Sequence, residues 1–154
     1  MSLVEQLAET SSSDDALACI VQHFAADSGT IHLLGEDGYL HLAAASKGMP
    51  DVVLQTIRTI PVGKGMAGLA AERRIPVNAC NIQTDASGDV RPGARATALS
   101  GAIVVPMFLA DEVVGTLGIA NRAERTFSGE EIAMLLEAGR ALAARRNSAE
   151  KTAP

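Results

Sequence analysis

Five side chains in this sequence are suited to nucleophilic, redox or metal chemistry, because thiolates and imidazoles attack electrophiles, carry protons and bind metals. The cysteines are Cys19 and Cys80, and the histidines are His23, His32 and His41. Two cysteines make neither a disulfide framework nor a metal cluster, and the histidines show no ligand spacing. We therefore expect no metal centre and no cofactor. Cys19 and His23, which flank an apolar helical stripe, are assigned a structural role.

A glycine-rich run, VGKGMAG at 62–68, is a second candidate for chemistry. Backbone N–H groups at the start of a helix can bind an anion. The run lacks the Gly-Lys-Ser/Thr ending of a phosphate-binding P-loop, however. We interpret it as a tight turn whose glycines adopt positive φ.

The bulk composition restricts the possible classes of function. The chain has 154 residues, of which 47% are hydrophobic, and a net charge of −5. This length fits one domain with its own core. Nucleic-acid binding usually requires a basic surface with aromatic stacking platforms, and three phenylalanines, one tyrosine and no tryptophan offer few. The N-terminus is too polar for a signal peptide and the longest apolar run, at 102–110, is too short to span a bilayer. We expect a cytoplasmic protein with no nucleic-acid or membrane partner.

Helices are predicted at both ends of the chain. Residues 3–9 form a short helix, and the serines at 11–13 offer N-caps for a second. The apolar stripe of that second helix has the spacing i, i+3, i+4, i+7 and consists of Leu17, Ile20, Val21 and Phe24. Near the C-terminus, Ser128 and Glu131 form a capping-box pattern. The stripe that follows consists of Ile132, Leu135, Leu136, Gly139 and Leu142. The tail at 147–154 is expected to fray.

Strands are predicted between these helices. Two alternating runs around Gly-Glu-Asp-Gly, at 30–34 and 39–46, favour a hairpin. A short helix, a short strand, a second helix and another short strand are then expected at 50–58, 59–65, 66–74 and 75–77. The irregular stretch that follows, up to residue 97, has the length of a functional or disordered loop. This order of elements favours an α+β domain.

The last predicted hairpin, at 104–121, has one bulky face and one small face, because side chains alternate along a strand. The bulky face carries Val113, Leu117 and Ile119 together with Gly115. The small face carries Val114, Thr116, Gly118 and Ala120. Two explanations of the small face stay open. It lines a cavity, or it allows a helix or loop to pack close to the sheet.

Four segments, in this order, resemble a GAF domain: TIHLLGEDGYLHLAAASKG, PVGKGMAGLAAERRIPV, GAIVVPMFLADEVVGTLGIAN and FSGEEIAMLLEAGRALA. The resemblance implies a single domain over 1–154, with its core at about 15–146. It implies a central antiparallel sheet of five or six strands with the terminal helices on one face. Short helices and the long loop would cover the other face and enclose a ligand pocket. Such domains bind small molecules and signal, often as dimers through the terminal helices.

One branch of this family is enzymatic, the free methionine-R-sulfoxide reductases, and the sequence is similar to them around the 104–121 hairpin. Their chemistry requires an attacking thiolate and an acid that protonates the sulfoxide oxygen. The cysteines of that branch match Ala67 and Arg95, and its acids match Ala102, Gly118 and Ala120. Neither cysteine of this chain falls at a matching position. We therefore expect no enzyme, with a divergent reductase as an alternative.

The same comparison indicates a candidate ligand pocket, because the residues of the reductases that match the small face point into theirs. The candidate ligand-binding residues are His32, Met66, Arg91, Arg95, Thr97, Ala102, Val104, Thr116, Gly118 and Ala120. An apolar floor beneath two arginines of the loop, Arg91 and Arg95, suits an anionic or carbonyl-bearing ligand.

A further signature of the family is incomplete. Some cyclic-nucleotide-binding GAF domains carry an Asn-Lys…Phe…Asp-Glu pattern, which Asn121-Arg122, Phe127 and Glu130-Glu131 resemble loosely. The spacing from the phenylalanine to the acid is one residue short, and the cation is arginine. We interpret these residues as an Arg122–Glu131 surface pair or as simple helix capping.

The sequence thus predicts a non-catalytic domain that binds an unknown small molecule and signals through a homodimer or a separate effector protein. The alternative is a GAF domain without a pocket that serves dimerisation or protein interaction. In the dimer, Gly139 would allow the C-terminal helices of two chains to approach closely.

Overall fold

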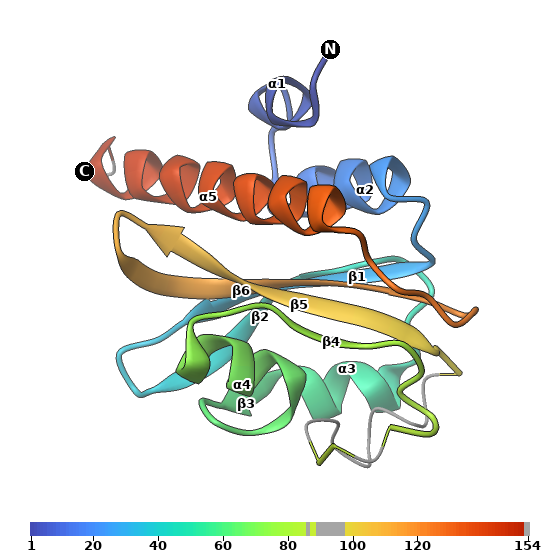
Figure 1. Ribbon diagram of the computed structural model, residues 1–154. Helices are drawn as coiled ribbons and strands as arrows, with labels where there is room; N and C mark the ends of the chain where they lie inside the picture. Colours follow the sequence, from blue (N-terminus) through green and yellow to red (C-terminus); the bar gives the residue numbers. More distant parts are fainter. Residues whose placement is uncertain (86, 89–97, 153–154) are drawn as a thin grey trace.

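The computed structural model describes residues 1–85, 87–88 and 98–152, with side chains through Arg145. Within these residues, six strands form one antiparallel sheet in the order β3-β2-β1-β6-β5-β4 (Figure 1). The strands are β1 (Ser28–Leu34), β2 (Tyr39–Ala45), β3 (Thr59–Pro61), β4 (Val77–Ala79), β5 (Gly101–Leu109) and β6 (Glu112–Asn121). The helices are α1 (Leu3–Ala8), α2 (Ser13–His23), α3 (Asp51–Ile57), α4 (Gly65–Arg73) and α5 (Gly129–Thr152). The predicted α+β domain with five or six antiparallel strands is confirmed.

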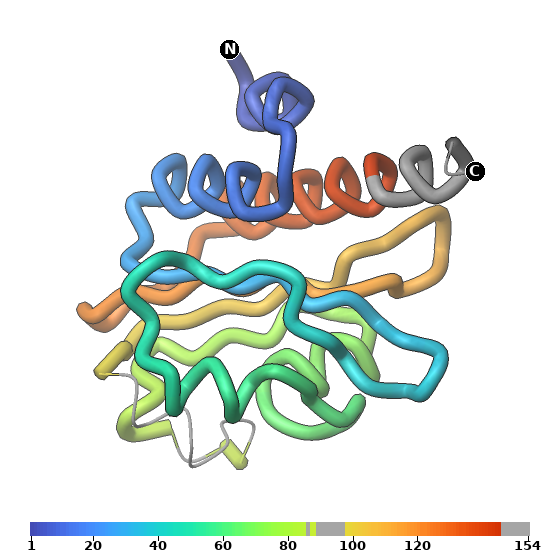
Figure 2. The backbone as a smooth tube through the Cα atoms, turned by 180° about the vertical axis from the view of Figure 1, so that it is seen from behind, coloured from blue at the N-terminus to red at the C-terminus, as the bar shows by residue number. Residues whose placement is uncertain are grey.

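Helices α2 and α5 lie side by side across one face of the sheet (Figures 1 and 2). Their predicted apolar stripes pack against that face, where Leu17, Ile20 and Leu135 are buried. Gly139 belongs to the same contact, because a Cβ atom there would lie 3.2 Å from Met107 Cγ. Gly139 therefore serves close packing within one chain, not between two chains as the sequence predicted. The homodimer itself stays a prediction.

The start of α5 is held by the predicted capping box. The Ser128 N–H donates to Glu131 Oε1 at 3.0 Å, and the Glu131 N–H donates to Ser128 Oγ at 3.1 Å. The predicted ion pair is wrong, because Arg125 rather than Arg122 pairs with Glu131, at 2.6 Å. The Ser128 N–H first, and then the Arg125 guanidinium, hold the pKa of the Glu131 carboxyl below its ordinary value. Arg122 instead donates its backbone N–H to Asp27 Oδ2 at 2.7 Å, beside the start of β1.

Helix α5 is longer than the sequence predicted. We expected the tail at 147–154 to fray, whereas α5 continues to Thr152, and residues 153–154 lie outside the described chain. The tail contains no glycine, and its one proline is the last residue, Pro154. Nothing in it therefore interrupts helical hydrogen bonding before that point.

A bulge near the β5–β6 turn reverses the alternation of side chains. The register shifts between Met107 and Phe108, so that Met107 pairs with Gly115 and Phe108 pairs with Val113. The one extra residue changes the face on which its neighbours point. Val114 packs on the core beneath α2 and α5, and Val113 packs on a cluster of the opposite face. The predicted faces of these two valines are therefore exchanged, while the rest of β6 keeps its predicted faces.

The short helix α1 lies outside the layer formed by α2 and α5 (Figure 1). Its Leu3 and Leu7 are buried in the same core cluster as the stripes of those helices. Arg145 of α5 holds the C-terminal end of α1. Its Nη1 donates to the Leu7 carbonyl at 2.9 Å, and its Nη2 donates to the Thr10 carbonyl at 2.6 Å. A guanidinium suits this place, because the last carbonyls of a helix carry the negative end of its dipole.

Helices α3 and α4 cover the opposite face of the sheet (Figures 1 and 2). His32 of β1 is 2% exposed beneath this layer, and its Nε2–H donates to the Ile57 carbonyl at the end of α3, at 2.8 Å. Burial disfavours the imidazolium ion and holds the pKa of His32 below its ordinary value of 6.5. His32 thus ties α3 to the sheet as a neutral ring.

We predict that Arg145→Met loosens α1 without unfolding the sheet. Hydrogen bonds from a charged group contribute about 1–3 kcal/mol, so the opening free energy of α1 should fall by roughly that amount. Hydrogen exchange followed by mass spectrometry should show faster exchange in residues 1–12 and unchanged exchange in β5 and β6. Arg140→Met, on the exposed side of the same helix, is the control with the same change of charge. Unchanged protection of α1 in Arg145→Met would contradict the role of the guanidinium.

We also predict an acid-sensitive contribution of His32 to stability. The unfolded chain protonates His32 near its ordinary pKa, whereas the folded chain resists protonation. The free energy of unfolding should therefore fall as the pH decreases below about 6.5. Urea unfolding at about pH 7.5 and about pH 5.5 measures this loss, which should shrink in His32→Leu and persist in the exposed control His23→Asn. An identical pH dependence in His32→Leu and the parent protein would rule out this origin.

Candidate ligand-binding site

Strand pairing gathers the small residues of the sheet into two rows. Gly118 of β6 lies between Thr30 of β1 and Val104 of β5. The next row joins Ser28, Ala120 and Ala102. Residues paired in this way share one face of the sheet, here the face beneath α3 and α4. The rows form a nearly flat, mostly apolar floor, because none of these side chains is larger than valine.

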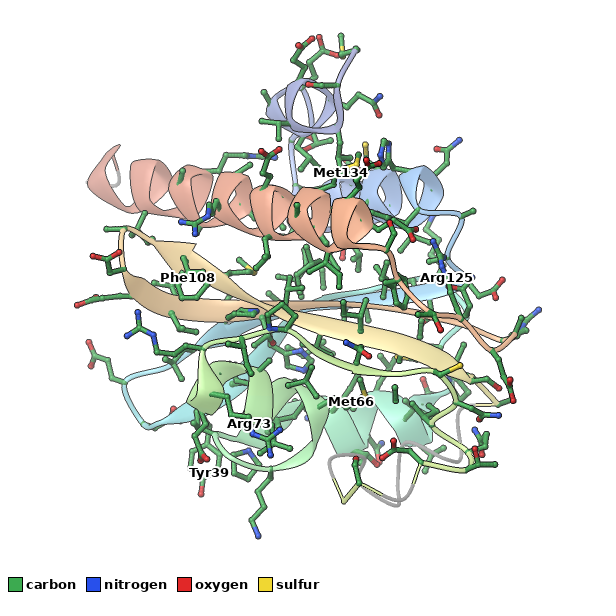
Figure 3. All side chains as sticks on the ribbon, viewed as in Figure 1. Tyr39, Met66, Arg73, Phe108, Arg125 and Met134 are labelled. Atoms are coloured by element: carbon green, nitrogen blue, oxygen red, sulfur yellow. The ribbon has the colours of Figure 1, made fainter. Side chains whose placement is uncertain are left out.

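A hollow of about 140 Å³ lies above this floor. Its walls are apolar and come from α3, from α4 and from the segments that precede α3 and β5. They comprise Met49, Val53, Ile57, Met66, Ile82 and Leu99. Met66, in the first turn of α4, lies below the sheet in the view of Figure 3. A floor and walls of this kind can enclose the apolar part of a small molecule.

The atoms around Gly118 help to decide whether the small face lines a cavity or allows a helix to pack closely. A Cβ atom on Gly118 would have Val104 Cγ2 at 3.2 Å, Thr30 Oγ1 at 3.4 Å and Ile103 O at 3.6 Å as its three nearest atoms. All three belong to the sheet itself, and none belongs to a covering helix. At Gly29, on the other face, the nearest atom is Val21 Cγ2 of α2, at 2.8 Å. Glycine thus permits close helix packing at Gly29, whereas Gly118 lies under the hollow.

A second hollow, also of about 140 Å³, neighbours the first, and Ser28, Met49 and Leu99 line both. It is the polar mouth of the site, and Lys47 and Arg122 lie on its rim together with Asp27. The mouth therefore differs in character from the apolar hollow. We treat these two neighbouring hollows as one candidate cleft, with an apolar part at Gly118 and a charged part at Lys47 and Arg122.

Hydrogen bonds between strand ends hold the mouth in place. The Gly29 N–H donates to Ser46 Oγ at 3.1 Å, and the hydroxyls of Ser28 and Ser46 lie 3.1 Å apart. These contacts fix the end of β2 beside the start of β1, so that Lys47 follows directly at the entrance. The Asp27 carboxylate accepts the Arg122 N–H and fixes the end of β6 on the other side.

The structure brings five of the ten predicted site residues together around the apolar hollow: Met66, Ala102, Val104, Gly118 and Ala120. His32 and Thr116 share the same face of the sheet, but they are paired one row further along and do not line the hollow. His32 was expected as a polar pocket wall, and its ring instead bonds to α3. The Thr116 hydroxyl is buried and has no hydrogen-bond partner among the described residues. The remaining three, Arg91, Arg95 and Thr97, lie outside the described residues.

Sequence reasoning missed the mouth of the site. Lys47 and Arg122 are far apart in the chain, and each follows shortly after the end of a strand. Strands β2 and β6 both pair with β1 in antiparallel orientation, so their last residues meet at the start of β1. The sequence predicted the hairpin of β1 and β2, but not the pairing of β1 with β6. That pairing was the signal that could have placed Lys47 and Arg122 together.

A larger hollow, of about 340 Å³, lies on the opposite face of the sheet, between α5 and residues 11–13. Arg145, the one cation among its described lining residues, already donates to the end of α1. The lining Ser11 hydroxyl donates to Asp15 Oδ2 at 3.1 Å. Because Arg145 and Ser11 are thus engaged with the protein itself, we place the candidate site on the other face.

The thiols do not assemble a reactive centre in the described part of the chain. Cys19 and Cys80 are both free, and the Cys19 thiol donates to Gln6 Oε1 at 3.2 Å. No group of three His, Cys, Asp or Glu side chains within the described residues could hold a metal ion. Among the described helices, none has both the length and the apolar character needed to cross a membrane.

Comparison with known structures supports the fold. The GAF domain of a phosphoenolpyruvate-protein phosphotransferase from Acinetobacter is similar, with a TM-score of 0.78 and 20% identity over 99% of this chain and 92% of that chain. The corresponding GAF domain from Coxiella burnetii gives a TM-score of 0.77 and 21% identity over 97% and 90%. A free methionine-R-sulfoxide reductase from Neisseria meningitidis, in complex with its substrate, gives 0.78 and 18% over 98% and 87%. Identities this low support the fold alone.

A comparison with curated proteins finds no match. The family model for the GAF domain matches residues 8–144, which is most of the chain. This match agrees with the antiparallel sheet, with the terminal helices on one face and with the hollow on the other. The chain belongs to the GAF domain family.

Proposed function

We propose that this protein is a non-catalytic regulatory domain that binds a small molecule in the hollow above Gly118. The observation that carries the proposal is the hollow of about 140 Å³ that Gly118 helps to line, where the three atoms nearest to a Cβ on that glycine all belong to the sheet. Burial of the apolar part of a ligand there stabilises the complex by about 25 cal/mol per Å² of apolar surface removed from water. The signal would pass through a homodimer or to a separate effector protein.

A non-catalytic role is supported by the residues on the floor and at α4. Where the reductase branch of the family has a thiol and carboxylates, the described part of this site has Ala67, Ala102, Gly118 and Ala120. None of these side chains can attack a sulfoxide or protonate its oxygen. The fifth position of that comparison, Arg95, lies outside the described residues.

The size of the hollow favours a second candidate function. Ligand pockets typically measure about 300–1,000 Å³, and the apolar hollow, at about 140 Å³, lies below that range. A hollow this small is also compatible with a domain that binds another protein and no small molecule. A direct binding experiment separates the two functions.

We predict that a small amphipathic molecule, hexan-1-ol, binds in the hollow. The methionines act as built-in reporters, because Met49 and Met66 line the hollow, whereas Met107 lines the larger cavity on the other face and Met134 is exposed on α5. In ¹³C-methyl methionine NMR, titration should shift the signals of Met49 and Met66 and leave the other two unchanged.

Substitutions of Gly118 make this experiment specific. Gly118→Phe should fill the hollow and abolish the shifts, at a cost of roughly 1–3 kcal/mol in stability. Gly118→Ala adds only the Cβ atom, which presses on Val104 Cγ2 at 3.2 Å, and should keep the binding. Absence of any shift at Met49 and Met66 in the parent protein would favour the protein-binding module instead.

We further predict no turnover of free methionine-R-sulfoxide, because the required thiol and acid are missing. A reductase assay with dithiothreitol as the reductant measures this directly. Turnover that disappears in Cys80→Ser, while Cys19→Ser keeps it, would show that Cys80 supplies a nucleophile and that the protein is an enzyme after all.

A further inference from the structure

The cleft has two chemically distinct ends. Among its described lining residues the apolar hollow has no charged side chain, whereas the mouth carries Lys47, Arg122 and Asp27. Ser28, Met49 and Leu99 line both ends, so the two ends lie next to each other, and the proposal below requires one molecule to reach both. A ligand that fits both must itself have an apolar body and a polar head.

The mouth carries more positive than negative side chains among its described residues. Within the described residues, Lys47 and Arg122 have no ion-pair partner, and both side chains extend from exposed residues. The Asp27 carboxylate, in contrast, already accepts the Arg122 N–H at 2.7 Å. Two cations and one engaged anion leave the mouth with a net positive charge. A cation bound here would therefore be repelled and an anion attracted.

The hydroxyls of the mouth add a neutral donor. Ser46 Oγ accepts the Gly29 N–H and lies 3.1 Å from Ser28 Oγ. One hydroxyl proton is used between these two oxygens, because only one proton can lie between them. The other hydroxyl proton is left to donate to a ligand. A head group that accepts hydrogen bonds and carries negative charge matches all of these groups.

We infer that the ligand is a small amphipathic anion whose apolar body fills the hollow over Gly118 and whose carboxylate, or a similar anionic head, lies between Lys47 and Arg122. The inference rests on the proposed function, since it names the ligand class of that same site. These two cations follow the ends of β2 and β6, whereas Arg91 and Arg95, the cations expected from sequence, lie outside the described residues.

The test compares two probes of equal length, hexanoate and hexanamide, by the methyl shifts of Met49 and Met66. Exposed ion pairs contribute about 0.2–1 kcal/mol each, so with two such pairs hexanoate should bind about two- to thirtyfold more tightly than hexanamide at low ionic strength. The preference should shrink as the salt concentration rises from about 0.02 M to about 0.5 M, because exposed charges are screened.

Variants identify the source of the preference. The double variant Lys47→Gln/Arg122→Gln should bind both probes equally and keep the affinity for hexanamide. The control Lys64→Gln/Arg140→Gln makes the same change of net charge at exposed residues outside the cleft and should keep the preference. Asp27→Asn keeps an acceptor for the Arg122 N–H but removes a negative charge, so it should increase the preference for hexanoate.

Each outcome decides a separate question. Binding of hexanamide with no preference for hexanoate overturns the anionic ligand class and leaves the pocket intact. A preference that persists in Lys47→Gln/Arg122→Gln overturns the assignment of these two cations. Failure of both probes to shift Met49 and Met66 overturns the proposed function, and with it this inference.

Discussion

The in-register antiparallel pairing of β1, β6 and β5 is the constraint on which the rest of this structure depends. Apart from the bulge between Met107 and Phe108, this pairing assigns the residues of the three strands to one of two faces. Ile31, Ile103 and Leu117 meet α2 and α5, which bury the larger core. The alternate positions are small, so α3 and α4 cannot fill the space above them completely. The core on one face and the hollow on the other both follow from the alternation of side chains along β1, β5 and β6.

Glycines on the two faces of the sheet have different surroundings. Gly29 and Gly139 lie where α2 and α5 approach the sheet, and a side chain at either would meet atoms of the opposite layer. Gly118 lies on the other face, where its neighbours belong to the same sheet. The same residue type therefore has two physical roles in this fold. It allows tight packing on one side and leaves a space on the other.

Periodic and local features were readable from the sequence, because each depends on a few neighbouring residues. The stripes of α2 and α5, the capping box at Ser128 and the hairpin at 104–121 are of this kind. The bulge at Met107 was not readable, because a bulge changes register without a characteristic composition. The partner of Glu131 is Arg125 and not Arg122, whose backbone N–H bonds to Asp27, a residue 95 positions earlier in the chain.

The candidate site was predictable on its floor and not at its mouth, for a related reason. Ala102, Gly118 and Ala120 lie on two neighbouring strands of one hairpin, and alternation alone places them on one face. Lys47 and Arg122 meet only because two different strands pair with β1. Such a meeting depends on the order of strands in the sheet, which the pattern of a single sequence does not specify. His32 was placed on the correct face, but its bond to Ile57 depends on where α3 ends.

The floor of the cleft is formed by strands, whereas its charged residues follow the strand ends. This difference affects which parts of the cleft can change in evolution. The floor residues belong to strands whose opposite face is the main core, so a substitution there disturbs two layers at once. Lys47 and Arg122 follow the strands and are exposed, so their side chains can change without repacking either layer. The shape of the cleft is therefore inherited with the fold, whereas its charge can be altered by one or two surface substitutions. Under the proposed function, descendants of one ancestral chain would recognise different head groups on similar apolar bodies while their folds remain superimposable.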